Sequence, residues 1–305
     1  MASETNRREF LTLVAAAGAA GWSPATADAQ RSMPTRRIPV SGEGLPVVGF
    51  GSSKVVEEIA AHGESPLRQV LRTLVAEGGT VVDTWPRNPA NDGRFGAVIN
   101  EPELRGKLFV ATKIDKVGKA AGVAQFREAQ RLYGRKPIDL AQIFSLTDLE
   151  THWPSLRAWK DAGEARYIGI TVSEPRLHGA LEAFLRKERP DFTQVNYSIT
   201  EREAETTLLP LAADRGVAVL VNRPFMNGAL FKRLAATPLP PWATELGATS
   251  WAQFSLKYIL AHPAVTCVLT ETSNPKHMAE NAAAAFGPLP DEVARRRMRE
   301  FLATA

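Results

Sequence analysis

Short apolar segments alternate with longer amphipathic ones from residue 37 onward, and this alternation limits the possible fold more than any other feature. Eight of the apolar segments are typical of buried strands, and each is followed by a segment with helical periodicity. Strands that are separated by helices throughout form a parallel sheet whose faces the helices cover. Eight such units in 305 residues fit one closed (β/α)8 TIM barrel better than an open sheet.

Two segments lie outside this repeat. Apolar residues at 37–40 and 45–50 flank Gly42-Glu43-Gly44, which predicts an N-terminal β-hairpin followed by the first strand. The range 291–302 predicts an extra C-terminal helix. The other strands are expected at 80–83, 108–113, 138–144, 165–171, 191–195, 217–222 and 265–269. The helices are expected at 65–77, 95–100, 120–133, 153–162, 175–187, 201–214, 250–261 and 275–285.

The composition excludes several classes of site and partner. Cys267 is the only cysteine, which excludes a disulfide framework and a cysteine-based zinc site. The five histidines show no metal-ligand spacing, so we expect no metal. The formal net charge is only +4, and no dense run of Lys and Arg interleaves with aromatic residues, so we expect no nucleic-acid partner. No G-x-G-x-x-G follows the first strand, which argues against a Rossmann fold.

Residues 1–29 have the pattern of an export signal, which leaves 30–305 as the predicted barrel domain. Arg7 and Arg8 precede a short apolar run at 11–22, and Ala27-Asp28-Ala29 forms an A-x-A cleavage site. This is typical of a twin-arginine signal; an ordinary secretory signal or an amphipathic tail is the alternative. The run is shorter than the ~20 residues of a membrane span, so we expect no stable membrane anchor. We expect the twin-arginine machinery to export the folded protein to the periplasm or the medium.

Polar residues stand at the predicted carboxyl ends of several strands, where the active sites of such barrels lie. The first two are Asp83 and Lys113, on adjacent strands. An Asp and a Lys so placed can form a buried ion pair, because burial without a partner is costly for either charge. Either the pair only neutralises itself, or the lysine lowers the pKa of a neighbouring acid for proton transfer. The residues alone leave both interpretations open.

The loop after the second strand carries Trp85 and Arg87. These residues are candidates to line a substrate pocket for an anionic or aromatic ligand. The alternative is that they only pack the loop.

The chain from about residue 37 to 285 resembles the aldo-keto reductases, most of all an exported bacterial branch of that family. The resemblance rests on seven motifs in the family's order: LPVVGFG at 45–51, GGTVVDT at 78–84, GKLFVATK at 106–113, IDLAQI at 138–143, GEARYIGIT at 163–171, QVNYS at 194–198 and TSNPKHMAEN at 272–281. It implies a TIM barrel that uses a nicotinamide nucleotide to transfer hydride to a carbonyl group. In the family a Tyr donates the proton, a Lys and an Asp tune that Tyr, and a His orients the carbonyl.

The catalytic match implied by the resemblance is partial. Asp83 and Lys113 fall on the family's Asp and Lys, but Asn88 stands at the Tyr position and Phe144 at the His position. Asn has no titratable proton, and removing a positioned acid typically costs about 10²–10⁴ in rate. Phe cannot donate a hydrogen bond to the substrate oxygen.

The resemblance also implies a set of cofactor-binding residues. Thr171 and Gln194 fall where the family holds the nicotinamide amide, and Asn222 falls where a residue stacks on the ring. The remaining positions are Arg223 after the seventh strand, Glu271, Thr272, Ser273 and His277 in the loop for the 2′-phosphate, and Glu280 and Asn281 at the adenine. Glu271 and His277 replace the Lys and Arg of many members, and a carboxylate repels a phosphate. Arg223 and Lys276 are candidates to supply a positive charge in place of those residues. The resemblance therefore implies either NADP(H) or NAD(H) as the cofactor.

Two functions follow from these observations. The first is an NAD(P)-linked oxidoreductase that acts on a small carbonyl compound with altered or weakened chemistry. Lys113, or a water held by Asn88, then replaces the Tyr. The second is a catalytically silent barrel that binds a nucleotide or another small ligand.

Overall fold

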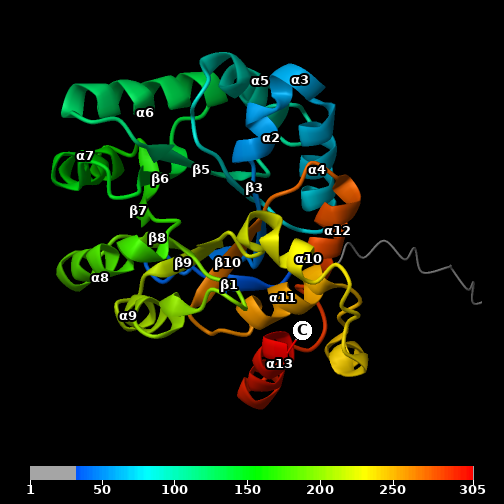
Figure 1. Ribbon diagram of the computed structural model, residues 1–305. Helices are drawn as coiled ribbons and strands as arrows, with labels where there is room; N and C mark the ends of the chain where they lie inside the picture. Colours follow the sequence, from blue (N-terminus) through cyan, green and yellow to red (C-terminus); the bar gives the residue numbers. More distant parts are fainter. Residues whose placement is uncertain (1–31, 305) are drawn as a thin grey trace, which may run out of the picture. The chain divides into compact units, whose positions relative to one another are not determined.

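The computed structural model describes residues 32–304, in which eight parallel strands close into a barrel that helices surround (Figure 1). This confirms the predicted (β/α)8 TIM barrel. The predicted export signal, residues 1–29, lies outside the described residues. In their order around the barrel the strands are β3 (Val48–Gly51), β4 (Val81–Asp83), β5 (Phe109–Ile114), β6 (Ile138–Phe144), β7 (Ala165–Thr171), β8 (Phe192–Asn196), β9 (Ala218–Asn222) and β10 (Val265–Thr270).

The helices follow the strands in the expected alternation. They are α2 (Ser53–Glu57), α3 (Ile59–His62), α4 (Ser65–Ala76), α5 (Pro89–Ile99), α6 (Lys119–Tyr133), α7 (Leu149–Asp161), α8 (His178–Lys187), α9 (Leu208–Asp214), α10 (Ala229–Arg233), α11 (Trp251–Leu260), α12 (Pro275–Ala283) and α13 (Glu292–Thr304). Short 3-10 turns lie at Pro175–Leu177, Glu203–Glu205, Met226–Gly228 and Pro241–Leu246. Of these elements, α2, α3, α10 and the last two turns fall outside the segments expected from periodicity.

Each strand is buried on both faces because the barrel interior covers one and the helices cover the other. In β4, Val81 belongs to the apolar cluster inside the barrel, whereas Val82 belongs to the cluster between strands and helices. Alternation then turns Asp83 to the inside. The same alternation places Phe109 and Ala111 of β5 inside, and Lys113 with them. The pleat therefore brings these two charges into one layer at the carboxyl end of the barrel.

The predicted N-terminal hairpin closes the opposite end of the barrel. Strand β1 (Thr35–Arg37) pairs antiparallel with β2 (Gly44–Pro46). The Arg36 guanidinium donates hydrogen bonds to the carbonyls of His262 and Val265, next to the start of β10. Tyr167, inside the barrel, donates its hydroxyl to Ser41 at 2.8 Å. These contacts leave only the carboxyl end of the barrel open for chemistry.

The extra C-terminal helix, α13, is fixed to the barrel wall by a polar network. Its Arg295 is only 7% exposed and donates to the Tyr197 hydroxyl at 2.8 Å. The same guanidinium lies 2.5 Å from the Glu205 carboxylate, which also accepts from the Tyr258 hydroxyl. The predicted helix is thus present as part of the packed domain.

Helix α5 begins at Pro89, six residues before the expected start at 95. Asn88 is its N-cap and Pro89 its first residue. Proline is favoured at the first helical position, and Asn is among the best N-caps. Periodicity missed this first turn because it contains few apolar residues, although the Asn-Pro pair signals it.

Candidate functional site

The centre of the candidate site is a buried ion pair at the carboxyl ends of β4 and β5. Lys113 Nζ lies 2.5 Å from Asp83 Oδ2, and each residue is only 5% exposed. The lysine also donates to the Thr84 carbonyl at 3.0 Å. The two charges compensate each other and so reduce the cost of their burial. An ammonium group has three donors, and two of them make these hydrogen bonds.

Two glutamines complete the surroundings of the Asp83 carboxylate. Gln142 Nε2 donates to Oδ1 at 3.2 Å, and Gln194 Nε2 donates to Oδ2 at 3.1 Å. Strand register explains the convergence, because Lys113 and Gln142 are partners across β5 and β6. The carboxylate therefore accepts from three side chains on three other strands, which fixes its orientation.

An aromatic stack lies one layer further toward the mouth. The ring centroids of Trp85 and Phe144 are 3.8 Å apart, and the Arg87 guanidinium carbon lies 3.7 Å from the Trp85 ring. Trp85 Nε1 donates to Asp115 Oδ2 at 2.9 Å, and Gln125 donates to the other oxygen of that carboxylate. The predicted pocket residues Trp85 and Arg87 are thus brought together with Phe144, and two polar residues hold the indole in place.

Asn88, which the family resemblance places at the Tyr position, forms hydrogen bonds that stabilise the start of α5. Its side-chain oxygen accepts from the backbone N–H groups of Ala90 at 3.0 Å and Asn91 at 3.4 Å. The residue is exposed, and no hydrogen bond among the described residues joins it to Asp83 or Lys113. The structure therefore does not bring Asn88 into the network of the ion pair.

Within the described residues, none of the four tyrosines of the chain makes a hydrogen bond to Asp83 or Lys113. Tyr133 is fully buried between α6 and the outer face of the barrel, where burial, together with the charges of Asp92 and Asp83, raises its pKa above the usual range. Tyr167 contacts the hairpin, and the hydroxyls of Tyr197 and Tyr258 both donate to Glu205. None of them therefore offers its hydroxyl to the ion pair.

A buried carboxyl supports the loop that carries the stack. Asp92, in the first turn of α5, is 2% exposed and accepts from the Arg87 backbone N–H at 3.1 Å. Burial raises its pKa to about 6, although hydrogen bonds from the backbone N–H groups of Arg87 and Asn88 oppose this shift. Asp92 thus ties the loop to the start of the helix.

Three predicted cofactor residues lie at or near the carboxyl ends of β7, β8 and β9. Thr171 ends β7, Gln194 lies in β8 and Asn222 ends β9. Asn222 donates to the Val172 carbonyl at 2.9 Å. Thr171 Oγ1, Gln194 Oε1 and Asn222 Oδ1 are buried and have no hydrogen-bond partner within residues 32–304. Buried polar atoms are normally paired, so these three acceptors fit a ligand with amide N–H donors.

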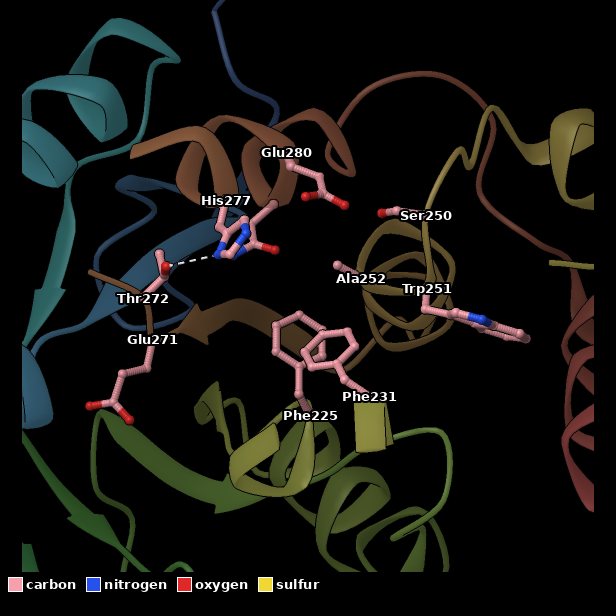
Figure 2. Close-up of a pocket in the computed structure, with 10 residues that line it drawn as sticks. Phe225, Phe231, Ser250, Trp251, Ala252, Glu271, Thr272, His277 and Glu280 are labelled. Atoms are coloured by element: carbon pink, nitrogen blue, oxygen red, sulfur yellow. Dashed lines mark hydrogen bonds between the residues drawn. The ribbon is translucent and has the colours of Figure 1, made fainter. Parts of the chain in front are cut away.

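A cavity of about 300 Å³ lies beside these strand ends (Figure 2). Its walls come from the segments after β9 and β10, from the start of α11 and from α12. The lining residues are Phe225, Phe231, Ser250, Trp251, Ala252, Glu271, Thr272, His277, Glu280 and Asn281. Five of the predicted cofactor residues are among them: Glu271, Thr272, His277, Glu280 and Asn281. Arg223 and Ser273 are not; Arg223 donates to the Ser173 carbonyl at 2.6 Å, and Ser273 is exposed.

Backbone strain is concentrated beside the same site. Among the described residues, six that are not glycine have positive φ, and all lie in two loops. They are Ser145, Leu146 and Asp148 after β6, and Arg223, Met226 and Asn227 after β9. Such conformations cost of order 1–3 kcal/mol each and occur mainly at ligand-binding segments. The two loops begin next to Phe144 and Asn222 and so border the ion pair and the cavity.

Several residues of the site were absent from the sequence analysis. Gln142, which orients Asp83, is two residues before Phe144 and therefore on the same strand face, so alternation alone could have identified it. Asp115 directly follows β5 and is two residues after Lys113, so the same alternation could have identified it. The aromatic walls of the cavity carry no comparable signal, because segments distant in the sequence bring them together.

The described residues contain neither a candidate metal site nor a helix that could span a membrane. Within 32–304, no group of three or more His, Cys, Asp or Glu side chains is arranged to hold a metal ion. No helix in the same range is both long and apolar enough to cross a bilayer.

Comparisons with known proteins agree with this architecture. An aldo-keto reductase from Klebsiella pneumoniae, solved in complex with NADPH, has a TM-score of 0.72 at 18% identity, over 88% of this chain and 95% of the other. The holo form of aldo-keto reductase AKR11C1 from Bacillus halodurans has a TM-score of 0.69 at 21% identity, over 88% and 96%. A Bombyx mori aldo-keto reductase in complex with NADP has a TM-score of 0.66 at 21% identity, over 88% and 93%. The model of the aldo/keto reductase family matches residues 47–299, and the chain therefore belongs to that family.

Proposed function

We propose that the protein is a nicotinamide-nucleotide-linked oxidoreductase that reduces a small carbonyl compound, with Lys113 as the proton donor. The observation that carries this proposal is the Asp83–Lys113 pair at the barrel mouth, fixed by Gln142 and Gln194. Two of the structural relatives were solved with NADP or NADPH. Family membership and this geometry together support a redox site of the same general kind.

The residues around the pair fit a nicotinamide group. The unpaired acceptors on Thr171, Gln194 and Asn222 suit the N–H donors of its carboxamide. The aromatic and polar walls of the cavity suit the adenosine end of the same molecule, because binding sites combine apolar surface with a few polar groups. A bound nicotinamide nucleotide would supply the hydride for the carbonyl carbon.

The chain's own residues handle the proton. Lys113 has one N–H donor beyond its two described hydrogen bonds, and this donor binds the carbonyl oxygen. As negative charge develops on that oxygen, the ammonium stabilises it and then donates a proton to form the alcohol. Asp83 holds the ammonium in position and compensates its charge. Phe144 offers no second hydrogen bond, so we expect slower turnover than in members with Tyr and His.

One observation favours the second candidate, a catalytically silent barrel. The stack of Trp85, Phe144 and Arg87 lies one layer beyond the ion pair, on the side from which a carbonyl compound would approach. Asn88 is committed to capping a helix. A protein that kept nucleotide binding but lost turnover would have these features.

Binding and turnover measurements distinguish the candidates. The purified protein is titrated calorimetrically with NADH, NADPH and their oxidised forms, and nucleotide oxidation is then followed with a panel of small aldehydes and ketones. Turnover that Lys113→Met abolishes while nucleotide binding persists supports the proposal. Tight binding without turnover on any carbonyl supports the silent barrel. Failure of every nucleotide to bind at millimolar concentration contradicts the proposed function.

We also propose that residues 1–29 direct export of the folded protein through the twin-arginine route. Arg7 and Arg8, the apolar run and the A-x-A site support this. A route that carries folded proteins suits one that takes up its nucleotide before it leaves the cytoplasm. We expect replacement of both arginines by lysine to retain the protein in the cytoplasm, as measured by cell fractionation. Unchanged export of that variant would contradict the proposal.

A further inference from the structure

The cavity beside the barrel mouth is acidic. Two of its lining residues, Glu271 and Glu280, carry carboxylates, and none of its lining residues is Lys or Arg. Figure 2 shows Glu280 and His277 on α12 and Glu271 just after β10, with Phe225 and Phe231 on the opposite side of the cavity from α12. Acidic residues from two separate segments thus contribute to the cavity wall.

The neighbouring cations do not offset this charge. The Arg223 guanidinium donates to the Ser173 carbonyl and is not part of the lining. Lys276 is exposed and also lies outside the lining. The backbone N–H of Lys54 donates to Glu271 at 2.8 Å, and its ammonium lies 3.9 Å from Glu58. The replacement charge sought at Arg223 or Lys276 is thus not supplied to the cavity.

We infer that the nucleotide is NAD(H) rather than NADP(H), and that Glu271 and Glu280 are the residues that select it. This inference rests on the proposed function. NADP(H) differs from NAD(H) by a phosphate on the adenosine ribose, which carries up to two negative charges. An acidic side chain accepts hydrogen bonds from a free ribose hydroxyl, whereas a phosphate at that position requires a cation. Two carboxylates and no cation therefore favour the unphosphorylated ribose and repel the phosphate.

The aromatic walls are consistent with this assignment. Phe225 and Phe231 have ring centroids 4.9 Å apart, and Trp251 lies on the adjacent helix α11. These rings offer apolar surface to a planar heterocycle such as adenine. The selection between the two nucleotides then depends on charge alone, because both carry the same adenine.

The test is a calorimetric titration of the purified protein with NADH and NADPH at pH 8. We expect NADH to bind at least tenfold more tightly. Glu271→Gln keeps an acceptor for the Lys54 N–H but removes the charge. We therefore expect a smaller preference for NADH over NADPH, measured as the ratio of their dissociation constants. Glu271→Lys is expected to reduce the preference for NADH further or to reverse it. Glu300→Gln makes the same charge change at an exposed position of α13 and should leave the preference for NADH unchanged.

A second pair of probes isolates the adenosine end. We expect 5′-AMP to compete with NADH at lower concentration than 2′,5′-ADP, which adds only the 2′-phosphate. Equal or tighter binding of NADPH by the unaltered protein would overturn this inference and leave the proposed function standing. Absence of binding by both dinucleotides would overturn the two together.

Discussion

The indole ring of Trp85 packs on the phenyl ring of Phe144, with centroids 3.8 Å apart and planes inclined by 32°. Trp85 follows Asp83 by two residues, and Phe144 follows Gln142 by two, so the stack covers the layer that holds the ion pair. A pair of aromatic rings thus stands where the family resemblance places a polar side chain toward the substrate oxygen. This contact joins the end of β6 to the loop that follows β4.

Phe144→His is therefore expected to raise turnover. The imidazole would lie at the end of β6 and donate a hydrogen bond to the substrate oxygen, which strengthens as charge develops there. We expect kcat/KM for a small aldehyde to increase about tenfold or more. Phe144→Leu is the matched control, because it loosens the stack without adding a donor. An equal gain in both variants would show that access, and not hydrogen bonding, limits the reaction.

Asn88 is expected to matter for stability more than for turnover. Its side-chain oxygen caps α5, and replacing such a cap by Ala typically costs about 0.5–2 kcal/mol. We expect Asn88→Ala to lower the free energy of unfolding in urea by about that amount. Asn88→Asp keeps a capping oxygen and should lie close to the unaltered protein. A large loss of turnover in stable Asn88→Ala protein would instead indicate that the residue holds a catalytic water.

The ion pair allows stability and catalysis to be separated. Lys113→Met leaves the Asp83 carboxylate buried without its cation, and such a loss typically costs about 3–5 kcal/mol. The double variant Asp83→Asn, Lys113→Met removes both charges, so we expect it to recover most of that stability in urea unfolding. It should remain without turnover because the proton donor is missing. Recovered turnover in the double variant would exclude Lys113 as the donor.

The barrel could be predicted from the sequence because strands that are buried on both faces appear as short apolar runs. Amphipathic segments that end at glycines mark the helices between them. Strand β6 and strand β7 begin and end at the expected residues. The Asp83–Lys113 pair could also be predicted from the sequence, because the carboxyl ends of neighbouring strands lie side by side in a parallel barrel.

The rest of the site depends on contacts between distant segments. The Trp85–Phe144 stack joins the loop after β4 to the end of β6, and the cavity joins Phe225 with Glu280. No local pattern encodes these distances. The cap formed by Asn88 is encoded locally, because Asn followed by Pro is a common start of a helix.

Asp92 gives the protein a specific dependence of stability on pH. Burial raises its folded-state pKa to about 6, from a usual value of 3.8. The unfolded chain therefore loses this proton first as pH rises, so the folded state loses stability between pH 4 and 6. The shift corresponds to a cost of about 3 kcal/mol above pH 6. Asp92→Asn keeps an acceptor for the Arg87 N–H without the buried charge, so we expect it to be more stable than the unaltered protein at pH 7.

The measurement is the difference in free energy of unfolding between Asp92→Asn and the unaltered protein, from urea titrations at pH 4, 5, 6 and 7. We expect this difference to grow as pH rises and to level off above pH 6. Asp214→Asn, at an exposed position, is the matched control and should show no such trend. A difference independent of pH would mean that Asp92 is not the buried acid that titrates in this range. A difference of opposite sign would mean that its ionised form is needed to hold the loop of Trp85 and Arg87 in place.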